Sequence, residues 1–211
     1  MTRTDMTNDL APSGTPTLTD TAYTPTVLGL GGTLRPGSTS EQALRLALRA
    51  AGEHGARTEV ITATELELPM YDPGHRPLTA RAHRLLDAVR RADGIVIASP
   101  GYHGGTSGLL KNALDYLQEL AGDPVPYVDG KAVGCVVTTA GWQAGATTLT
   151  SLRSTVHALR GWPTPLGVVV NSSDKPFGPD GESTDPKVAG QLAALGGQVA
   201  SFARMRAAHL V

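Results

Sequence analysis

The sequence predicts one α/β domain with a doubly wound, parallel five-stranded sheet and helices on both faces. From Thr26 onward, short β-branched runs alternate with longer segments whose apolar residues recur every three or four positions, which is the pattern of buried parallel strands and the helices that cover them. The chain of 211 residues suits one such domain better than two. Right-handed crossovers leave few ways to wind the strands, and we expect the order 2-1-3-4-5.

Five short β-branched runs are expected to form the strands. They are residues 27–31, 58–62, 94–99, 132–139 and 166–170. With the strands in this order, the winding direction reverses between the first and the third strand, and ligands of such sheets bind at the carboxyl ends of those two strands. We therefore expect the chemistry of the protein just after Gly31 and just after Ser99.

Five amphipathic segments are expected to form the helices. In the first, the apolar residues that share one helical face are Leu44, Ala47, Leu48 and Ala51. Corresponding apolar stripes lie within residues 82–89, 110–117, 149–159 and 188–202. The last of these helices is expected to close the domain.

The composition favours a small-molecule partner. Lys and Arg total 18 and Asp and Glu total 19, so no overall basic field would attract nucleic acid or an anionic membrane. The single cysteine, Cys135, lies in an apolar run, so the chain can form no internal disulfide. We expect a protein of the reducing cytoplasm.

The N-terminal segment differs in composition from the rest of the chain. Residues 1–24 are rich in Thr, Asp, Pro and Ser and have no apolar core, unlike a secretory signal or a membrane anchor. No apolar stretch approaches the roughly 20 residues that cross a bilayer. We expect residues 1–24 to be a disordered tail and residues 25–211 to be the folded domain.

The loop after the first predicted strand has the residues of an anion site. It runs from Gly31 to Ser40 and leads directly into the first helix. Its glycines allow close backbone approach, and the helix amino terminus directs free N–H groups at the same point. Its polar side chains are Thr33, Arg35, Ser38 and Ser40. We expect a terminal phosphate here, and the alternative is a helix-capping turn that binds nothing.

Two better-known phosphate motifs do not fit this loop. Gly32 and Gly37 have the glycine spacing of a Walker motif, but Ser38 stands where that motif requires lysine. The dinucleotide fingerprint fails as well, because Gly31 is followed three residues later by Leu34 instead of glycine or alanine.

The loop after the third predicted strand is suited to a flat heterocycle. Its successive backbone amides could bind the edge of a ring, and Tyr102 could cover a face. The residues expected to line the pocket are Pro100, Gly101, Tyr102, His103, Gly104 and Gly105. His103 is interpreted as an ordinary solvated histidine, and Tyr102 could instead cover the core.

A third glycine-rich loop, residues 138–146, follows the fourth predicted strand and is expected over the same crevice. Gly141 permits close backbone approach. Thr139 and Trp142 complete the set of residues expected near the ligand, because a tryptophan in a glycine-rich loop at a strand end is poorly explained as core.

Together these loops resemble the NADPH-dependent FMN reductase family of flavodoxin-like proteins. Its phosphate loop reads Gly-Ser-x-Arg-x-x-Ser-x-Asn, and here residues 32–40 match it with Thr33 for serine and Ser40 for asparagine. The segment from Pro100 to Asp115 carries the Pro-x-Tyr pattern and the run Leu-Lys-Asn-Ala-Leu-Asp. The resemblance covers roughly residues 26–170.

The resemblance implies a flavodoxin-like fold and an FMN cofactor that accepts hydride from NADPH or NADH. It implies that Thr33, Arg35, Ser38 and Ser40 hold the FMN phosphate, and that Pro100 to Gly105 and Gly141 line the ribityl chain and ring. The acceptor would be free flavin, a quinone or a similar small molecule, and a flavin-dependent monooxygenase is a candidate recipient of reduced flavin. A homodimer or homotetramer is expected by analogy. We assign no catalytic acid or base and no metal ligand.

Two rival functions share the cofactor. A flavodoxin-type electron carrier would be expected to have strongly acidic docking surfaces, and the near-neutral charge balance argues against one. A non-catalytic FMN-binding protein, such as a regulator or a partner subunit, stays open.

Overall fold

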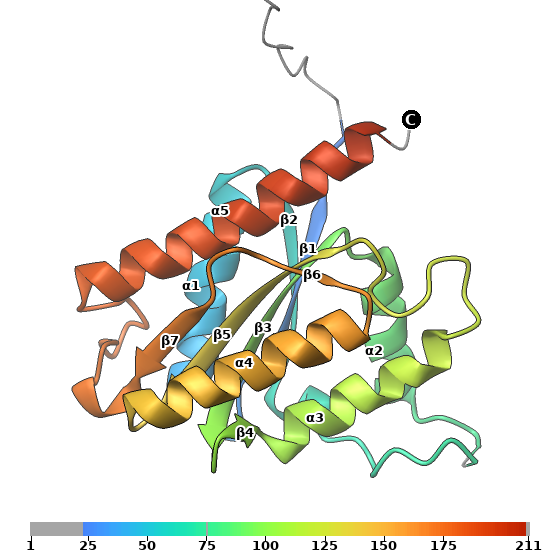
Figure 1. Ribbon diagram of the computed structural model, residues 1–211, viewed down its shortest axis with the longest axis horizontal. Coiled ribbons are helices and arrows are strands. Elements are labelled where there is room, and N and C mark those ends of the chain that lie inside the picture. Colours follow the sequence, from blue (N-terminus) through green and yellow to red (C-terminus); the bar gives the residue numbers. More distant parts are fainter. Residues whose placement is uncertain (1–22, 75, 210–211) are drawn as a thin grey trace, which may run out of the picture.

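A computed structural model describes residues 23–74 and 76–209, which form an α/β domain (Figure 1). Its strands are β1 (Thr26–Gly31), β2 (Arg57–Thr62), β3 (Gly94–Tyr102), β4 (Gly105–Thr106), β5 (Ala132–Thr139), β6 (Trp162–Pro163) and β7 (Val168–Asn171). Its helices are α1 (Thr39–Glu53), α2 (Ala80–Arg91), α3 (Gly108–Asp115), α4 (Trp142–Ala158) and α5 (Pro186–His209). Three short 3-10 helices complete it, namely η1 (Ala63–Leu66), η2 (Tyr116–Leu120) and η3 (Ser172–Asp174).

The sheet has the predicted order. The strands β2, β1, β3 and β5 lie side by side and parallel, and both β6 and β7 pair with the far edge of β5. The five predicted strands correspond to β2-β1-β3-β5-β7, so the order 2-1-3-4-5 is confirmed. The fold is the flavodoxin-like doubly wound α/β fold that the sequence predicts.

The last strand position differs from the prediction. The predicted strand 166–170 begins only at Val168, and β6 precedes it. Between them, Pro165 has no N–H to donate to a strand ladder, and the Thr164 hydroxyl donates to the Leu166 carbonyl at 2.7 Å. The strand position beside β5 is therefore filled by two short strands instead of one.

Two separate cores lie on the two faces of the sheet. One face carries α1 and α5, and the other carries α2, α3 and α4 (Figure 1). Neighbouring residues of each strand alternate between the two cores: Leu28 and Cys135 face α2, α3 and α4, whereas Val27 and Val136 face α1 and α5. Burial raises the pKa of the Cys135 thiol to about 12, because the charged thiolate is poorly solvated there.

The side of the sheet at which the parallel strands begin, here called its amino edge, is held together by long-range polar contacts. Asp93 accepts hydrogen bonds from the Tyr23 hydroxyl at 2.9 Å and from the Thr26 amide at 2.8 Å. Lys131 is buried, and its ammonium donates to the carbonyls of Val89 and Arg90 at the end of α2. Desolvation lowers the pKa of Lys131 to about 8.

The N-terminal tail was predicted to span residues 1–24. Residues 1–22 lie outside the described residues. Tyr23 and Thr24 are exposed, and the Tyr23 side chain contacts the domain through Asp93. In the described part of the chain, no helix is both long enough and apolar enough to cross a bilayer.

Candidate functional site

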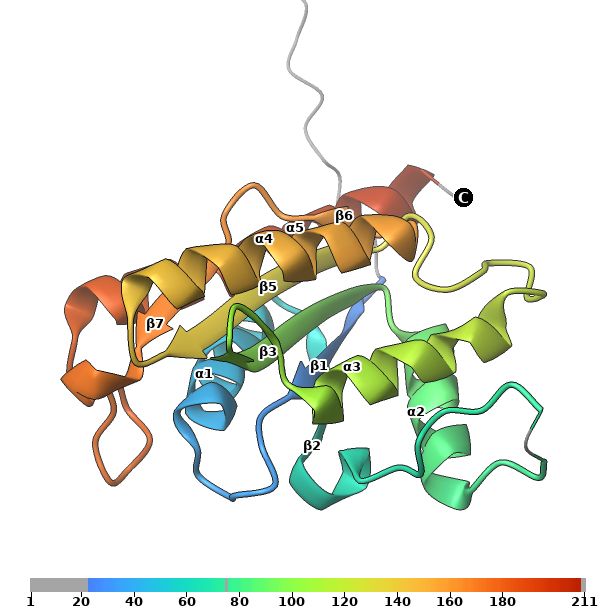
Figure 2. The ribbon, with the colours of Figure 1, turned by 60° about the horizontal axis from the view of Figure 1, so that its bottom comes forward.

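The carboxyl ends of β1, β3 and β5 lie side by side, and three segments of interest follow them (Figure 2). Gly31 at the end of β1 pairs with Ala98 of β3, and Pro100 of β3 pairs with Thr138 of β5. The first turn of α1 is joined to this edge, because the hydroxyls of Ser40 and Thr138 are 2.7 Å apart. The three segments therefore leave the sheet next to one another at the point where the winding reverses.

Glycine is required where the first loop leaves the sheet. Gly31 has a φ of +138°, and a Cβ atom placed there would lie 1.8 Å from the carbonyl oxygen of Ala98. Gly32 follows with a φ of +90°, and its amide donates to the same oxygen at 3.1 Å. The chain can turn tightly over β3 only because these positions have no side chain.

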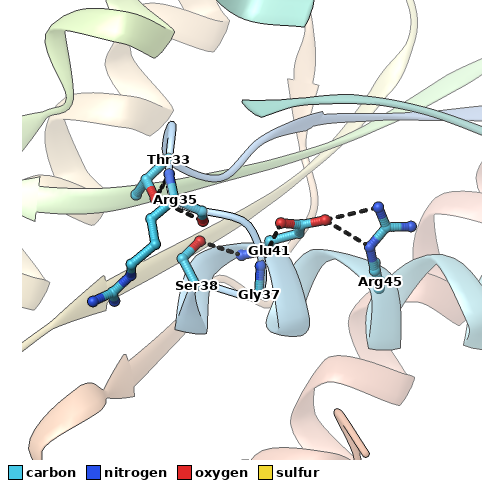
Figure 3. A network of polar contacts seen from close by, with 6 residues as sticks. All are labelled: Thr33, Arg35, Gly37, Ser38, Glu41 and Arg45. Atoms are coloured by element: carbon cyan, nitrogen blue, oxygen red, sulfur yellow. Dashed lines mark hydrogen bonds and ion pairs between the residues drawn. The ribbon is translucent and has the colours of Figure 1, made fainter. Parts of the chain in front are cut away.

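The loop is held in shape by its own polar groups (Figure 3). The Thr33 hydroxyl accepts from the Arg35 amide at 3.1 Å and donates to the Arg35 carbonyl at 3.2 Å. The Ser38 hydroxyl caps α1 by accepting from the Glu41 amide at 3.3 Å. The Glu41 carboxylate accepts from the Gly37 amide at 3.0 Å.

The four polar residues predicted to hold a phosphate have different surroundings. Arg35 is exposed and Thr33 is half-buried, whereas Ser38 and Ser40 are each only 2% exposed. The hydroxyls of the two serines are engaged with the helix cap and with Thr138. Within the described residues, the amides of Thr39 and Ser40 at the start of α1 have no acceptor. An anion at this loop would meet the Arg35 guanidinium and these amides.

The second segment is a β-hairpin, whereas the sequence predicted a loop there. Strand β3 continues to Tyr102, and Gly101 and Tyr102 pair with β4 in antiparallel fashion. The two residues at the tip, His103 and Gly104, have φ values of +54° and +81°. Two successive positive φ values are those of the type I′ turn, whose twist matches a two-residue hairpin. The glycine-rich composition concealed this strand extension.

The base of the hairpin is anchored by two serines. The buried Ser99 hydroxyl accepts from the Ser107 amide at 3.0 Å, and the Ser107 hydroxyl caps α3 by accepting from the Leu110 amide at 3.2 Å. Gly101 packs against the neighbouring strand, because a Cβ atom there would lie 2.5 Å from the Thr139 methyl group.

The first loop and the hairpin border one cleft of about 500 Å³. Tyr102 is 57% exposed and Leu34 is 50% exposed, so the cleft has apolar surface beside the Arg35 side chain. Its lining residues are Thr33, Leu34, Arg35, Tyr102, Ser107, Gly108 and Leu109. The structure thus brings together Thr33, Arg35 and Tyr102, which the sequence singled out, and adds four residues that it did not.

The third segment is shorter than predicted. Helix α4 begins at Trp142 with Gly141 as its N-cap, so residues 142–146 of the predicted loop are helical. Gly145 does not open a loop but lets α4 pack on β7, because a Cβ atom there would lie 2.3 Å from a methyl group of Val169. Trp142 is 62% exposed. Among the described residues that line the cleft, none comes from this segment.

Two residues near the first loop were not predicted from the sequence to belong to the site. Glu41 is 8% exposed and binds the loop, and Arg45 contacts the Glu41 carboxylate through Nε at 2.9 Å and a terminal nitrogen at 2.7 Å. The spacing of Ser38 and Glu41 is that of a capping box, in which a glutamate three residues after the N-cap binds back toward the start of the helix. That spacing could have identified Glu41 from the sequence.

Comparison with known proteins gives a family match over most of the domain. The family model described as NADPH-dependent FMN reductase matches residues 25–175. An iron-sulfur flavoprotein of Methanocaldococcus jannaschii is 33% identical over 96 residues, which are 42% of this chain and 50% of that protein. An NADPH azoreductase of a Bacillus species is 31% identical over 124 residues, which are 58% of this chain and 66% of that protein. The chain therefore spans about half to two thirds of the length of these relatives.

The fold has solved counterparts. The flavoenzyme FerB of Paracoccus denitrificans, an NAD(P)H:acceptor oxidoreductase, superposes with a TM-score of 0.69, covering 86% of this chain and 98% of its own. The sequence identity is 19%, so this likeness concerns the fold alone.

Proposed function

Because the chain belongs to the NADPH-dependent FMN reductase family, we propose that it uses FMN to pass reducing equivalents from NADPH or NADH to a small acceptor. The observation that carries this proposal is the shared cleft, in which a loop with an exposed arginine and a hairpin with an exposed tyrosine face one space. A flavin mononucleotide has an anionic end and a flat apolar ring. The cleft offers a partner for each.

The phosphate would be held at the first loop. Arg35 supplies the charge, and the unengaged amides at the start of α1 supply N–H donors aligned with the helix dipole. Thr33 fixes the backbone around Arg35 through its two local hydrogen bonds. Ser38 and Ser40 would act through the backbone they cap and anchor, since their hydroxyls already have partners.

The ring would lie toward the hairpin. Its residues Pro100, Gly101, Tyr102, His103, Gly104 and Gly105 present backbone and one aromatic face. Thr139 ends the adjoining strand β5, and Gly141 and Trp142 lie at the start of α4. FMN, when bound, supplies the hydride acceptance and two-electron chemistry. The chain's share is to bind the phosphate and to orient the ring, and we assign no acid–base role to His103 at the exposed tip.

We propose the chemical class of the electron acceptor and not one compound. One relative is described as an NADPH azoreductase, which supports including azo compounds with free flavin and quinones in an acceptor panel. A flavin-dependent monooxygenase as recipient of reduced flavin, a homodimeric or homotetrameric state, a cytoplasmic location and a domain spanning residues 25–211 are further proposals.

Ligand binding tests the cofactor site first. The purified chain, freed of flavin, is titrated with FMN and with riboflavin, and we expect FMN to bind at least about tenfold more tightly, since one charge-assisted contact is worth about that much. Equal affinity would place the phosphate site elsewhere.

Turnover then separates an enzyme from its rivals. With FMN bound, NADPH or NADH should bleach the flavin absorbance under anaerobic conditions without any partner protein, and addition of an acceptor should restore it. A flavin that neither nicotinamide reduces would favour an electron carrier or a non-catalytic flavin-binding protein.

A further inference from the structure

We propose that Arg45, which lies outside the phosphate loop, is a specificity-determining residue that neutralises Glu41 so that the loop can accept a phosphate. The inference rests on the proposed FMN phosphate site at residues 31–40. It concerns two residues on the first turns of α1: Glu41, which contacts the loop, and Arg45, which contacts Glu41 on the side away from Arg35 (Figure 3).

A carboxylate binds the same loop that is proposed to hold an anion. The Glu41 side chain is 10% exposed, its Oε2 accepts from the Gly37 amide at 3.0 Å, and its stem packs beneath Gly32. This contact is useful, because it fixes the turn at Gly37. It also places a negative charge, little screened by water, inside a loop meant for a dianion.

The charges of the segment show why a third group is needed. Arg35 and Glu41 are the charged side chains of residues 31–41. Their charges cancel, so this segment alone has no net positive charge. A phosphate monoester carries about −1.5 to −2 charges near neutral pH. Arg45 adds the missing positive charge, and its two contacts to Oε1 of Glu41 place that charge on the carboxylate itself.

The geometry separates the two tasks of Glu41. Oε2 binds the loop amide, and Oε1 binds Arg45. Only the Glu41 partner of this pair is buried, and Arg45 is half-exposed one helical turn away, so the pair should contribute only modestly to folding. Loss of Arg45 should therefore leave the protein folded while uncovering the Glu41 charge beside the phosphate.

A double-mutant cycle in the full chain tests this. FMN and riboflavin dissociation constants are measured for the unmodified protein, Arg45→Ala, Glu41→Gln and the double variant. We expect Arg45→Ala to raise the FMN constant about three- to tenfold, as for an unpaired charge left beside an ionic ligand, and to change the riboflavin constant by less than about twofold.

The double variant provides the decisive readout. Glutamine keeps an acceptor for the Gly37 amide but carries no charge, so Glu41→Gln combined with Arg45→Ala should restore FMN binding to within about twofold of the unmodified protein. If Arg45 instead only orients the Glu41 side chain, the double variant stays as weak as Arg45→Ala, and the proposal is overturned.

A matched control lies one turn further along α1. Arg49 pairs with Glu182, away from the loop, so Arg49→Ala should leave the FMN constant within about twofold. Should Arg45→Ala fail to fold, as judged by its thermal melt, Arg45→Gln removes the charge with less loss of volume and the same shifts are expected.

The outcomes distinguish this inference from the proposed function. If the unmodified protein binds FMN and riboflavin equally, the phosphate site itself is wrong. If it prefers FMN and Arg45→Ala preserves that preference, the site stands and the role of Arg45 is refuted.

Discussion

The amino and carboxyl edges of the sheet, where its parallel strands begin and end, are stabilised in different ways. At the amino edge, contacts join distant parts of the chain: the Tyr23 hydroxyl and Asp93 are 70 residues apart, and Lys131 reaches Val89 over 42 residues. At the carboxyl edge, the middle of the first loop is held by contacts between residues two to four apart, and long-range hydrogen bonds join its two ends, Gly32 and Ser40, to the sheet. Local contacts let a loop keep its shape without being part of the core, which suits the carboxyl edge to the proposed binding of FMN.

The largest expected effect is a loss of folding stability at one residue of the carboxyl edge, which would be an exception to this comparison. Gly31 belongs to the carboxyl edge, but Gly31→Ala should destabilise the fold by about 3 to 5 kcal/mol, because its Cβ would lie 1.8 Å from the Ala98 carbonyl of a central strand. Urea denaturation measures the loss. Gly37→Ala is the control, since that site has a φ of +68° but no atom within 4 Å of the new Cβ, and it should cost only about 1 kcal/mol.

A second prediction sharpens the comparison at the amino edge through pH. The folded pKa of Lys131, about 8, lies below its usual 10.5, so between these values the unfolded chain binds more protons and raising the pH favours folding. The unfolding free energy of the unmodified protein should gain up to about 3 kcal/mol relative to Lys131→Met from pH 8 to 10.5. At each pH, the dissociation constant of FMN should be the same for the two proteins. A constant difference between the two proteins across this range would contradict the lowered pKa.

The third prediction concerns the carboxyl edge alone. Arg35→Ala should weaken FMN binding by about 1 to 3 kcal/mol, the usual range for losing a hydrogen bond to a charged group. Riboflavin binding and the urea midpoint should stay the same, because the Arg35 side chain is exposed. A fall in stability together with a normal FMN constant would reverse the roles of the two edges.

The smallest effects are expected at the tip of the hairpin. Gly104→Val should cost about 1 to 2 kcal/mol, since a β-branched residue is strained at a φ of +81°, and should slow flavin reduction by NADPH in stopped-flow absorbance. His103→Ala should slow it far less, because no proton transfer is assigned to that exposed side chain. A loss of reduction confined to His103→Ala would contradict the mechanism.

The sequence predicted the sheet well because its strands have strong β-branched patterns. The order of the five main strands and the existence of all five helices agree with the structure. The strands β4 and β6 were missed, because two residues are too few to show a periodicity. The early start of α4 was missed for another reason: Gly145 suggested a loop, whereas its lack of a side chain serves packing against Val169.

The candidate site was predictable where contacts are local. The motif around Thr33 and Arg35 indicated an anion loop, and both residues line the cleft. The burial of the Ser40 hydroxyl against Thr138 joins residues 98 apart, and no local pattern signals such a contact. The hairpin tip at His103 was missed because a positive φ at a non-glycine residue depends on the pairing around it.

The burial of Cys135 also has a practical use for studying the site. It is the single cysteine of the chain, and its thiol is inaccessible and has a pKa of about 12, so thiol reagents should leave the native protein unlabelled at neutral pH. A cysteine introduced at Tyr102 or Trp142, both more than half exposed, would then be the one position to react. A fluorophore or spin label could follow the hairpin and the start of α4 without prior removal of the native thiol.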